Sequence, residues 1–171
     1  LSNSTSLGYG VSLPYYFALA ENKDATLIPK IYADENPVIQ TEYRHVTKNT
    51  NSILDVSYNQ GYKKSSGNKS GDSRNHIFAR SDINLDFENF DESKLSINYQ
   101  RTSNDTYLKV HDINSRIMSN HNIMHSSIDM NFSKNDTSLD ANMDMYENLG
   151  KIEDRYEFVL PNYNYKNKLS I

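Results

Sequence analysis

The chain has 171 residues, of which 36% are hydrophobic, and its formal net charge is -4. That length is enough for one domain with a core, and the mixed charges include no basic stripe of the kind that binds nucleic acid. The chain has no cysteine, so disulfides and thiolate chemistry are excluded within it. It has no run of about 18 apolar residues, so no transmembrane helix is expected.

Residues 9–20 alternate with a period of two, which predicts one long β-strand. A single parity of this stretch is apolar or aromatic throughout: Tyr9, Val11, Leu13, Tyr15, Phe17 and Leu19. Such a strand is about twice the usual length in soluble proteins. It is about as long as a tilted strand must be to cross a bilayer.

The same alternation recurs along the chain and predicts an all-β fold, an antiparallel meander of about nine long strands. The expected strands span 8–20, 24–33, 38–47, 52–62, 75–88, 94–102, 122–133, 138–147 and 155–166. Most turns between them are short, so neighbours in sequence should pair as hairpins. Residues 63–73 are rich in Lys, Ser and Gly and predict a flexible loop, and 103–120 predict a longer excursion.

The two faces of the predicted sheet differ in chemistry. One is expected to be continuously apolar and to contain Val11, Leu13, Phe17, Leu54, Val56, Ile83, Leu85, Leu95, Ile97, Ile128 and Met130. The other is dense in amides and charges, with Gln40, Glu42, Arg44, Arg80, Asp82, Asn84 and Asn98 as candidates for a wet lumen. A membrane barrel fits this pattern, and so does a soluble sheet with one wet face.

Candidate chemical groups favour no catalytic or metal site. His111, His121 and His125 have neither thiolates nor an ordered carboxylate set beside them, so we expect solvated loop histidines, no metal and no cofactor. The spaced carboxylates resemble an acid–base pair, but on strands they are more simply alternating lumen residues: Asp82 with Asp86, and Asp140 with Asp144.

Residues 13–29 resemble the first barrel hairpin of the LptD family, the lipopolysaccharide-assembly proteins also called organic solvent tolerance proteins. The family typically has a Pro-Tyr-Tyr-aromatic strand, an Asn-x-Asp-Ala-Thr turn and a second proline fifteen residues after the first; Pro14 and Pro29 match this spacing. Supporting similarity lies at 40–44, 54–58, 105–108 and 160–161. Glu21 departs from the family, in which a proline is common there.

The resemblance implies that 1–171 is a piece of a single large barrel in the outer membrane of a Gram-negative bacterium. It implies a non-enzymatic protein that inserts lipopolysaccharide into the outer leaflet through a lateral gate. Pro14, Tyr15, Tyr16 and Pro29 are the gate candidates. The implied partners are lipopolysaccharide, outer-membrane lipid, an LptE-type lipoprotein and a periplasmic LptA-type bridge. The alternative is a soluble or cell-surface antiparallel β domain with a binding or adhesive role.

Overall fold

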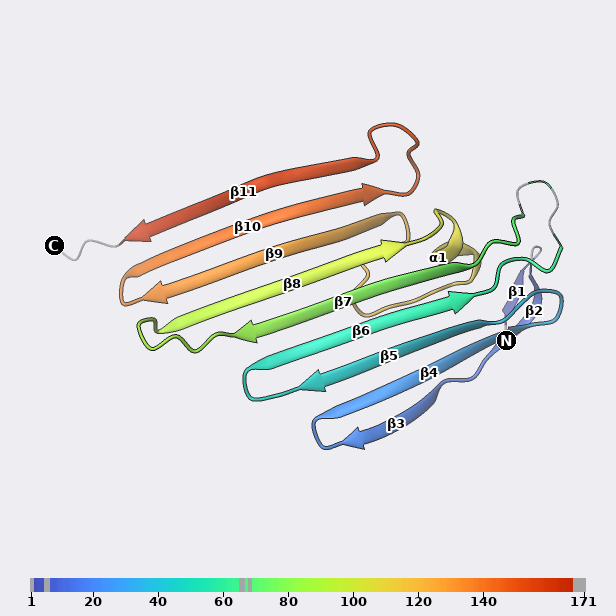
Figure 1. The fold of residues 1–171 in the computed structure, drawn as a ribbon, viewed down its shortest axis with the longest axis horizontal. Coiled ribbons are helices and arrows are strands. Elements are labelled where there is room, and N and C mark those ends of the chain that lie inside the picture. The colour runs from blue at the N-terminus through green and yellow to red at the C-terminus, as the bar shows by residue number, and fades with distance from the viewer. Residues whose placement is uncertain (1, 5–6, 65–66, 68, 168–171) are drawn as a thin grey trace.

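A computed structural model describes residues 2–4, 7–64, 67 and 69–167. Its strands form one sheet in which every neighbouring pair is antiparallel (Figure 1). From β4 onward each strand pairs with the next one in sequence, so the predicted meander is confirmed. The open sheet ends at β11 on one side, and at β1 and β3 on the other.

The strands are long, as the alternation predicts. They are β1 (Ser2–Ser4), β2 (Gly8–Ser12), β3 (Tyr15–Ala20), β4 (Lys23–Tyr32), β5 (Val38–Val46), β6 (Thr50–Asn59), β7 (Arg74–Asn84), β8 (Glu92–Thr102), β9 (Ile123–Lys134), β10 (Thr137–Asn148) and β11 (Tyr156–Asn167). One short helix, α1 (Tyr107–Val110), lies between β8 and β9. No helix in the described ranges is long and apolar enough to cross a membrane.

The first predicted strand, 8–20, is interrupted in the middle. β2 and β3 both pair with β4, in one shared register that runs from Val11 opposite Ile31 to Phe17 opposite Ala25. The interruption covers only Leu13 and Pro14. The alternation over 8–20 therefore predicts the path and the register of this strand correctly. A local break in the ladder divides it into two shorter strands.

Two other predicted strand ends are wrong. β7 ends at Asn84; Leu85 lies just beyond it and still donates to the Ser93 carbonyl at 2.8 Å, and Asp86, with a positive φ of 50°, begins the turn. β6 ends at Asn59, before the connection that was predicted as a flexible loop. Of that loop, residues 65, 66 and 68 lie outside the described part of the chain. Its beginning is tied down, because the Lys63 N–H donates to Glu35 Oε2 at 2.8 Å.

The strand register separates an apolar outer face from a polar inner face. One outer row crosses six strands and contains Phe17, Ala25, Tyr43, Leu54, Ala79 and Tyr99. The neighbouring inner row contains Arg44, Ile53, Arg80, Asn98, Ser127 and Asp144. The predicted apolar face is thus confirmed, except that Leu85 lies beyond the end of its strand.

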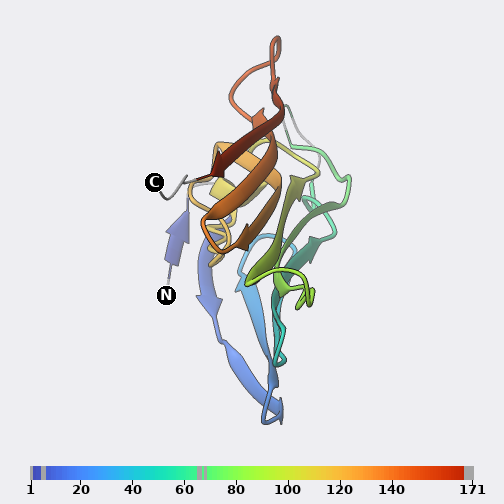
Figure 2. The ribbon, with the colours of Figure 1, turned by 90° about the vertical axis from the view of Figure 1, so that its left-hand side faces the viewer.

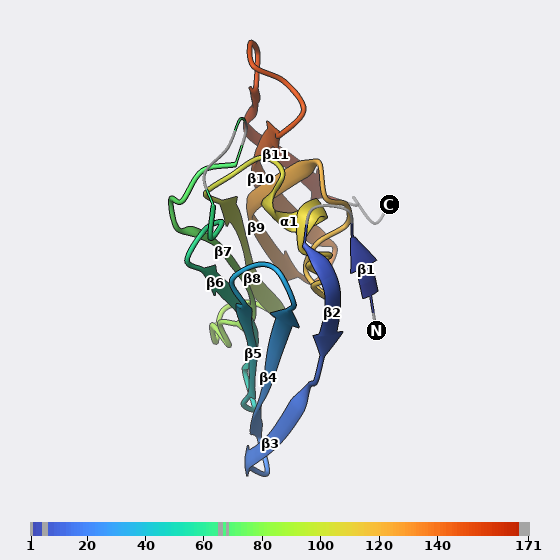
Figure 3. The same cartoon turned by 90° about the vertical axis from the view of Figure 1, so that its right-hand side faces the viewer.

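The sheet is curved, and α1 lies on its concave side, which is the inner face (Figures 2 and 3). The connection that contains α1, residues 103–122, folds back onto the inner face, and we call it the strap. The strap supplies a large part of the buried core, whose members are Leu7, Tyr32, Val38, Phe78, Tyr107, Leu108, Ile113, Met124 and Leu149. The excursion predicted at 103–120 therefore exists, but it packs against the inner face of the sheet.

A β-bulge interrupts the last pair of strands. Asn142 pairs with Asn162 and Asp144 with Val159, so Leu160 and Pro161 together face the single residue Met143. The extra residue reverses the alternation within β11, and apolar side chains face outward on both sides of the bulge. Proline is tolerated here because β11 is an edge strand of the described sheet.

Candidate functional site

Two of the four gate candidates mark the interruption between β2 and β3: Pro14 lies within it and Pro29 lies opposite it on β4. The Leu13 N–H donates to the Pro29 carbonyl at 3.3 Å. In an antiparallel ladder such a pair normally exchanges two bonds, but Pro29 has no N–H with which to return the second. The pairing between the first strand and β4 is therefore weakest at this point.

Pro14 removes a donor on the opposite side of the same strand. Residues of an antiparallel strand direct their N–H and C=O groups alternately to the left and right neighbour. Because Leu13 faces β4, the backbone of Pro14 faces the open edge of the sheet. Pro29 therefore weakens the first hairpin, whereas Pro14 removes a bonding position from the edge on which another strand would pair.

The neighbouring tyrosines lie on opposite faces of β3. Tyr15 belongs to the outer face, and Tyr16, opposite Thr26, belongs to the inner face. Both are exposed, with 52% and 61% of their surfaces accessible. Within the described residues β3 pairs with β4 alone, so its other edge is open to a further strand.

All of the predicted lumen residues lie on the inner face, but they divide into two environments. Gln40 is only 2% exposed because the strap covers it. Asn84 and Arg80 lie toward the end of the sheet with the short hairpins and are exposed. Glu42 and Arg44 lie between these regions; Arg44 Nε is 2.8 Å from Asp24 Oδ1, and Glu42 Oε1 is 3.4 Å from Nε of Arg116 in the strap.

Side chains on the inner face of the sheet form hydrogen bonds to the main chain of the strap. Lys30 on β4 donates to the His111 carbonyl at 3.1 Å, Gln40 on β5 to the Asn114 carbonyl at 3.0 Å, and Gln100 on β8 to the Ile117 carbonyl at 3.0 Å. These carbonyls follow one another every three residues along the strap. A polar inner face is therefore used here to bind a backbone segment that would otherwise be buried without partners.

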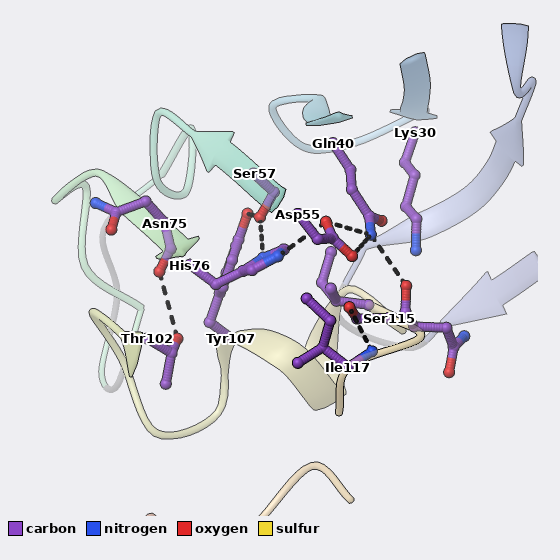
Figure 4. Close-up of polar contacts among 12 residues, drawn as sticks. Lys30, Gln40, Asp55, Ser57, Asn75, His76, Thr102, Tyr107, Ser115 and Ile117 are labelled. Atoms are coloured by element: carbon purple, nitrogen blue, oxygen red, sulfur yellow. Dashed lines mark hydrogen bonds and ion pairs between the residues drawn. The ribbon is translucent and has the colours of Figure 1, made fainter. Parts of the chain in front are cut away.

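A line of buried hydrogen bonds runs from Gln40 along the inner face, across β6 and β7, to α1 (Figure 4). His76 lies between Asp55 and Ser57, with its Nε2 at 3.1 Å from Asp55 Oδ1 and its Nδ1 at 2.6 Å from Ser57 Oγ. Ser57 Oγ is in turn 2.8 Å from the Tyr107 hydroxyl. The order of groups is that of a Ser-His-Asp triad, but the serine is buried and its hydroxyl contacts Tyr107. This arrangement anchors the strap.

His111 is buried rather than solvated, which corrects the prediction made for it. It is 3% exposed and its ring contacts Tyr107 and Tyr32. Burial lowers the pKa of His111 to about 4, and the nearby charges of Arg74 and Lys30 act in the same direction. Its imidazole is therefore neutral at physiological pH and packs as part of the core.

The other two histidines of the metal hypothesis are also engaged in hydrogen bonds. His121 Nε2 is 2.9 Å from the Ile113 carbonyl within the strap. His125 lies on β9, 2.7 Å from Asp144, and its ring stacks on Tyr146 at 4.5 Å between centroids. They do not converge with His111, and the described residues contain no group of three or more His, Cys, Asp or Glu side chains arranged to hold a metal ion.

The inner face beyond the strap is polar across β7 to β10. Asp140 and Asp144 share this face, as predicted, where Asp140 accepts from Asn131 and Asp144 from Asn142. Asp82 accepts from Ser96 at 2.8 Å, whereas Asp86 belongs to a turn and not to the strand, which corrects the predicted pairing of these two carboxylates. Such amide and carboxylate groups suit a water-filled passage.

An ion-pair cluster joins the beginning of the strap to the hairpin of β10 and β11. The Arg155 guanidinium contacts Asp105 in the strap at 2.6 and 3.0 Å, and Glu147 on β10 at 2.8 Å. These hydrogen bonds, that to Asp105 foremost, raise the pKa of Arg155. The cluster joins two connections that are far apart in sequence, and no sequence pattern indicated it.

The outer face is broadly apolar and carries a groove beside the β11 bulge. The groove has a volume of about 420 Å³ and crosses β8 to β11. The side chains that line it include Ile97, Tyr99, Ile128, Met143, Phe158 and Leu160. Aromatic residues lie at both ends of this face: Tyr9 is 73% exposed, and Phe87, which is 49% exposed, stacks on the partly buried Phe132.

Long antiparallel strands, an exposed apolar outer face and a polar, partly filled inner face define a piece of barrel wall of the outer-membrane type. Comparison with curated proteins finds several named LPS-assembly protein LptD. Those of Psychrobacter arcticus, Pseudomonas aeruginosa and Ralstonia nicotianae are 36%, 35% and 37% identical over 77, 57 and 51 residues, which is 45%, 33% and 30% of this chain. The chain is thus similar to LptD proteins, and the resemblance predicted from its sequence is confirmed.

The similarity covers only a small part of each relative. The matched segments span 8% of the Psychrobacter arcticus protein and 6% of each of the other two. No family model matches the chain. The likeness therefore concerns one stretch of sheet, and the activity of the whole protein is a matter for proposal.

Proposed function

We propose that this chain forms part of the barrel wall of a lipopolysaccharide-assembly protein in the outer membrane of a Gram-negative bacterium. In this function the apolar outer face meets lipid and the polar inner face lines the passage of the saccharide. The acyl chains leave sideways through a seam beside the first strand. No bond is made or broken, so the function requires no catalytic residue.

The observation that carries the proposal is the weak first strand. Its pairing with β4 loses the Pro29 donor, and its open edge loses the Pro14 donor. Each lost hydrogen bond is worth roughly 0.5–1.5 kcal/mol net. Its absence lowers the free-energy cost of moving the first strand and leaves the rest of the sheet fully paired. The seam partner would be a strand from the remainder of the barrel.

Chemistry on the two faces supports the same cargo. Lipopolysaccharide has a polar saccharide and several hydrocarbon chains, and the chain has a polar surface and an apolar surface separated by a single layer of strands. The adhesive alternative would require a wet outer face. Instead, outer side chains such as Phe158, Tyr163 and Leu13 are 65%, 76% and 47% exposed.

The partners proposed for the whole protein follow from its likeness to LptD proteins. They are lipopolysaccharide, an LptE-type lipoprotein and a periplasmic LptA-type bridge.

Restoring the missing donors is expected to slow lipid delivery. In the full-length protein, Pro14→Ala returns a donor to the open edge and Pro29→Ala returns one to the Leu13 carbonyl. Pro14→Ala should stabilise the closed seam, and Pro29→Ala the first hairpin, each by roughly 0.5–1.5 kcal/mol, which corresponds to an opening equilibrium lowered roughly 2- to 10-fold. The measurement is the rate of lipopolysaccharide delivery to the cell surface at matched protein levels in the membrane.

Pro37→Ala is the matched control, because Pro37 lies in the turn between β4 and β5 and away from the seam. A disulfide between the first strand and its seam partner should stop delivery more completely than either proline variant. Normal delivery by both the Pro14/Pro29 double variant and the locked seam would show that lipid leaves elsewhere.

A further inference from the structure

We propose that the strap holds β4 as the fixed neighbour of β3, so that sideways movement is confined to β3. The inference deepens the proposed function and rests on it, because it names the strand beside the seam that moves and the neighbouring strand that stays in place. It assigns a role to residues 103–122, which otherwise only fill space on the inner face.

The strap contacts β4 directly through charged and aromatic side chains. Lys30 donates to the carbonyls of both His111 and Asp112, and the distance to the first is 3.1 Å. The Tyr32 hydroxyl lies 3.2 Å from His111 Nδ1, and Tyr32 is almost completely buried. These contacts are at the end of β4 that pairs with β2, next to the interruption.

The same segment fastens the strands beyond β4 into one block. Gln40 on β5 and Gln100 on β8 donate to strap carbonyls, and Ser57 on β6 is hydrogen-bonded to Tyr107. Phe78 on β7 packs in the same core as Tyr107. Movement of β4 would therefore break its contacts with a strap that four further strands hold in place, which makes β4 stiff.

β3 has no comparable attachment, whereas β2 follows Leu7, which is 2% exposed and belongs to the same core as Tyr107. Among the described residues no hydrogen bond joins the strap to β3, and the positions from Ser12 to Ala20 are all exposed. Within the described sheet β3 is connected through its ladder with β4 alone, and that ladder follows the break at Leu13 and Pro29. The boundary between the stiff block and the movable strand therefore falls between β3 and β4.

Two distances that share one reference point test this boundary. Tyr15, Leu27 and Arg101 lie in one outer row, on β3, β4 and β8 respectively. Spin labels at 15 and 101 should be about 24 Å apart, and labels at 27 and 101 about 19 Å, from the usual spacing between strands. In the full-length protein in lipid, we expect a broad distribution for 15–101 and a narrow one for 27–101.

A variant that weakens the contact between β4 and the strap gives a second test. Lys30→Met removes the ammonium that holds the strap and keeps the length of the side chain, and it should broaden the 27–101 distribution. Lys94→Met is the matched control, because Lys94 lies on the same face of the sheet but contacts Glu92 rather than the strap. It should leave the 27–101 distribution narrow.

Equal widths for the two distances in the unmodified protein, whether narrow or broad, would overturn the inference. So would a 27–101 distribution that stays narrow in Lys30→Met. Neither distance depends on lipid delivery, which the locked seam measures separately. Failure of the gate function and failure of the static role of β4 are therefore distinguishable.

Discussion

Phe78→Ala is expected to destabilise the protein by about 3–5 kcal/mol, the usual cost of truncating a fully buried phenylalanine. Phe78 lies on the inner face of β7, is 0% exposed and packs with the strap residues Tyr107 and Leu108. A barrel with a merely water-filled lumen would tolerate this change. The free energy of unfolding of the full-length protein in lipid vesicles, measured by urea titration, is the appropriate readout.

Ile77→Ala is the control for this experiment. Ile77 is the next residue on the same strand but lies on the outer face, and it is 46% exposed. Its truncation should cost about 1 kcal/mol or less, as at other surface positions. Equal losses at 77 and 78 would contradict the assignment of a packed core to the inner face.

Ile97→Arg is expected to cost roughly 2–4 kcal/mol if this position lies near the bilayer midplane, because an arginine on the lipid face of a barrel has to be removed from water. Ile97 is on the outer face of β8, opposite Ile128 of β9. Asn84→Arg, on the exposed inner face of β7, should be mild. The same vesicle titration measures both variants.

Ile83→Arg extends the comparison to the residue next to the control. Ile83 and Asn84 are neighbours on one strand and lie on opposite faces. A difference in stability between the two arginine variants therefore reports the face of the sheet and not the depth in the membrane. If arginine is tolerated equally at 83, 84 and 97, the outer face does not meet lipid.

The strands were predictable because a period of two is a strong and repeated signal. It placed β4, β5 and β8 to β11 within about two residues, and it identified the outer face across the sheet. It failed where turn chemistry took over: Asp86 adopts a positive φ and begins the turn that follows β7. Periodicity alone contains no information about such a local break.

The strap was beyond sequence reasoning for a physical reason. Its hydrophobic residues follow no regular period, because they face a core from an irregular segment held by Lys30, Gln40 and Gln100. Those three polar residues are separated widely in sequence, and each looked like an ordinary lumen or strand residue. The available signal was the presence of apolar residues within this polar excursion: Tyr107, Leu108, Val110, Ile113, Ile117 and Met118.

The prolines were identified by sequence, but the direction in which each one acts was not. Spacing alone shows that Pro14 and Pro29 are fifteen residues apart. Only the ladder shows that Leu13 bonds to Pro29, and thus that Pro14 faces the other edge. The distinction matters because one proline weakens the hairpin and the other weakens the open edge at which we propose the seam.

The most direct test of the whole account is a measurement of what touches each face of β8 and β7 in the full-length protein in its membrane. A fluorophore at position 97 should be quenched by quenchers attached to lipid acyl chains and protected from quenchers dissolved in water. A fluorophore at position 84 should show the reverse. Quenching of both positions by the aqueous reagent alone would contradict the claim that this sheet is the wall of an outer-membrane barrel.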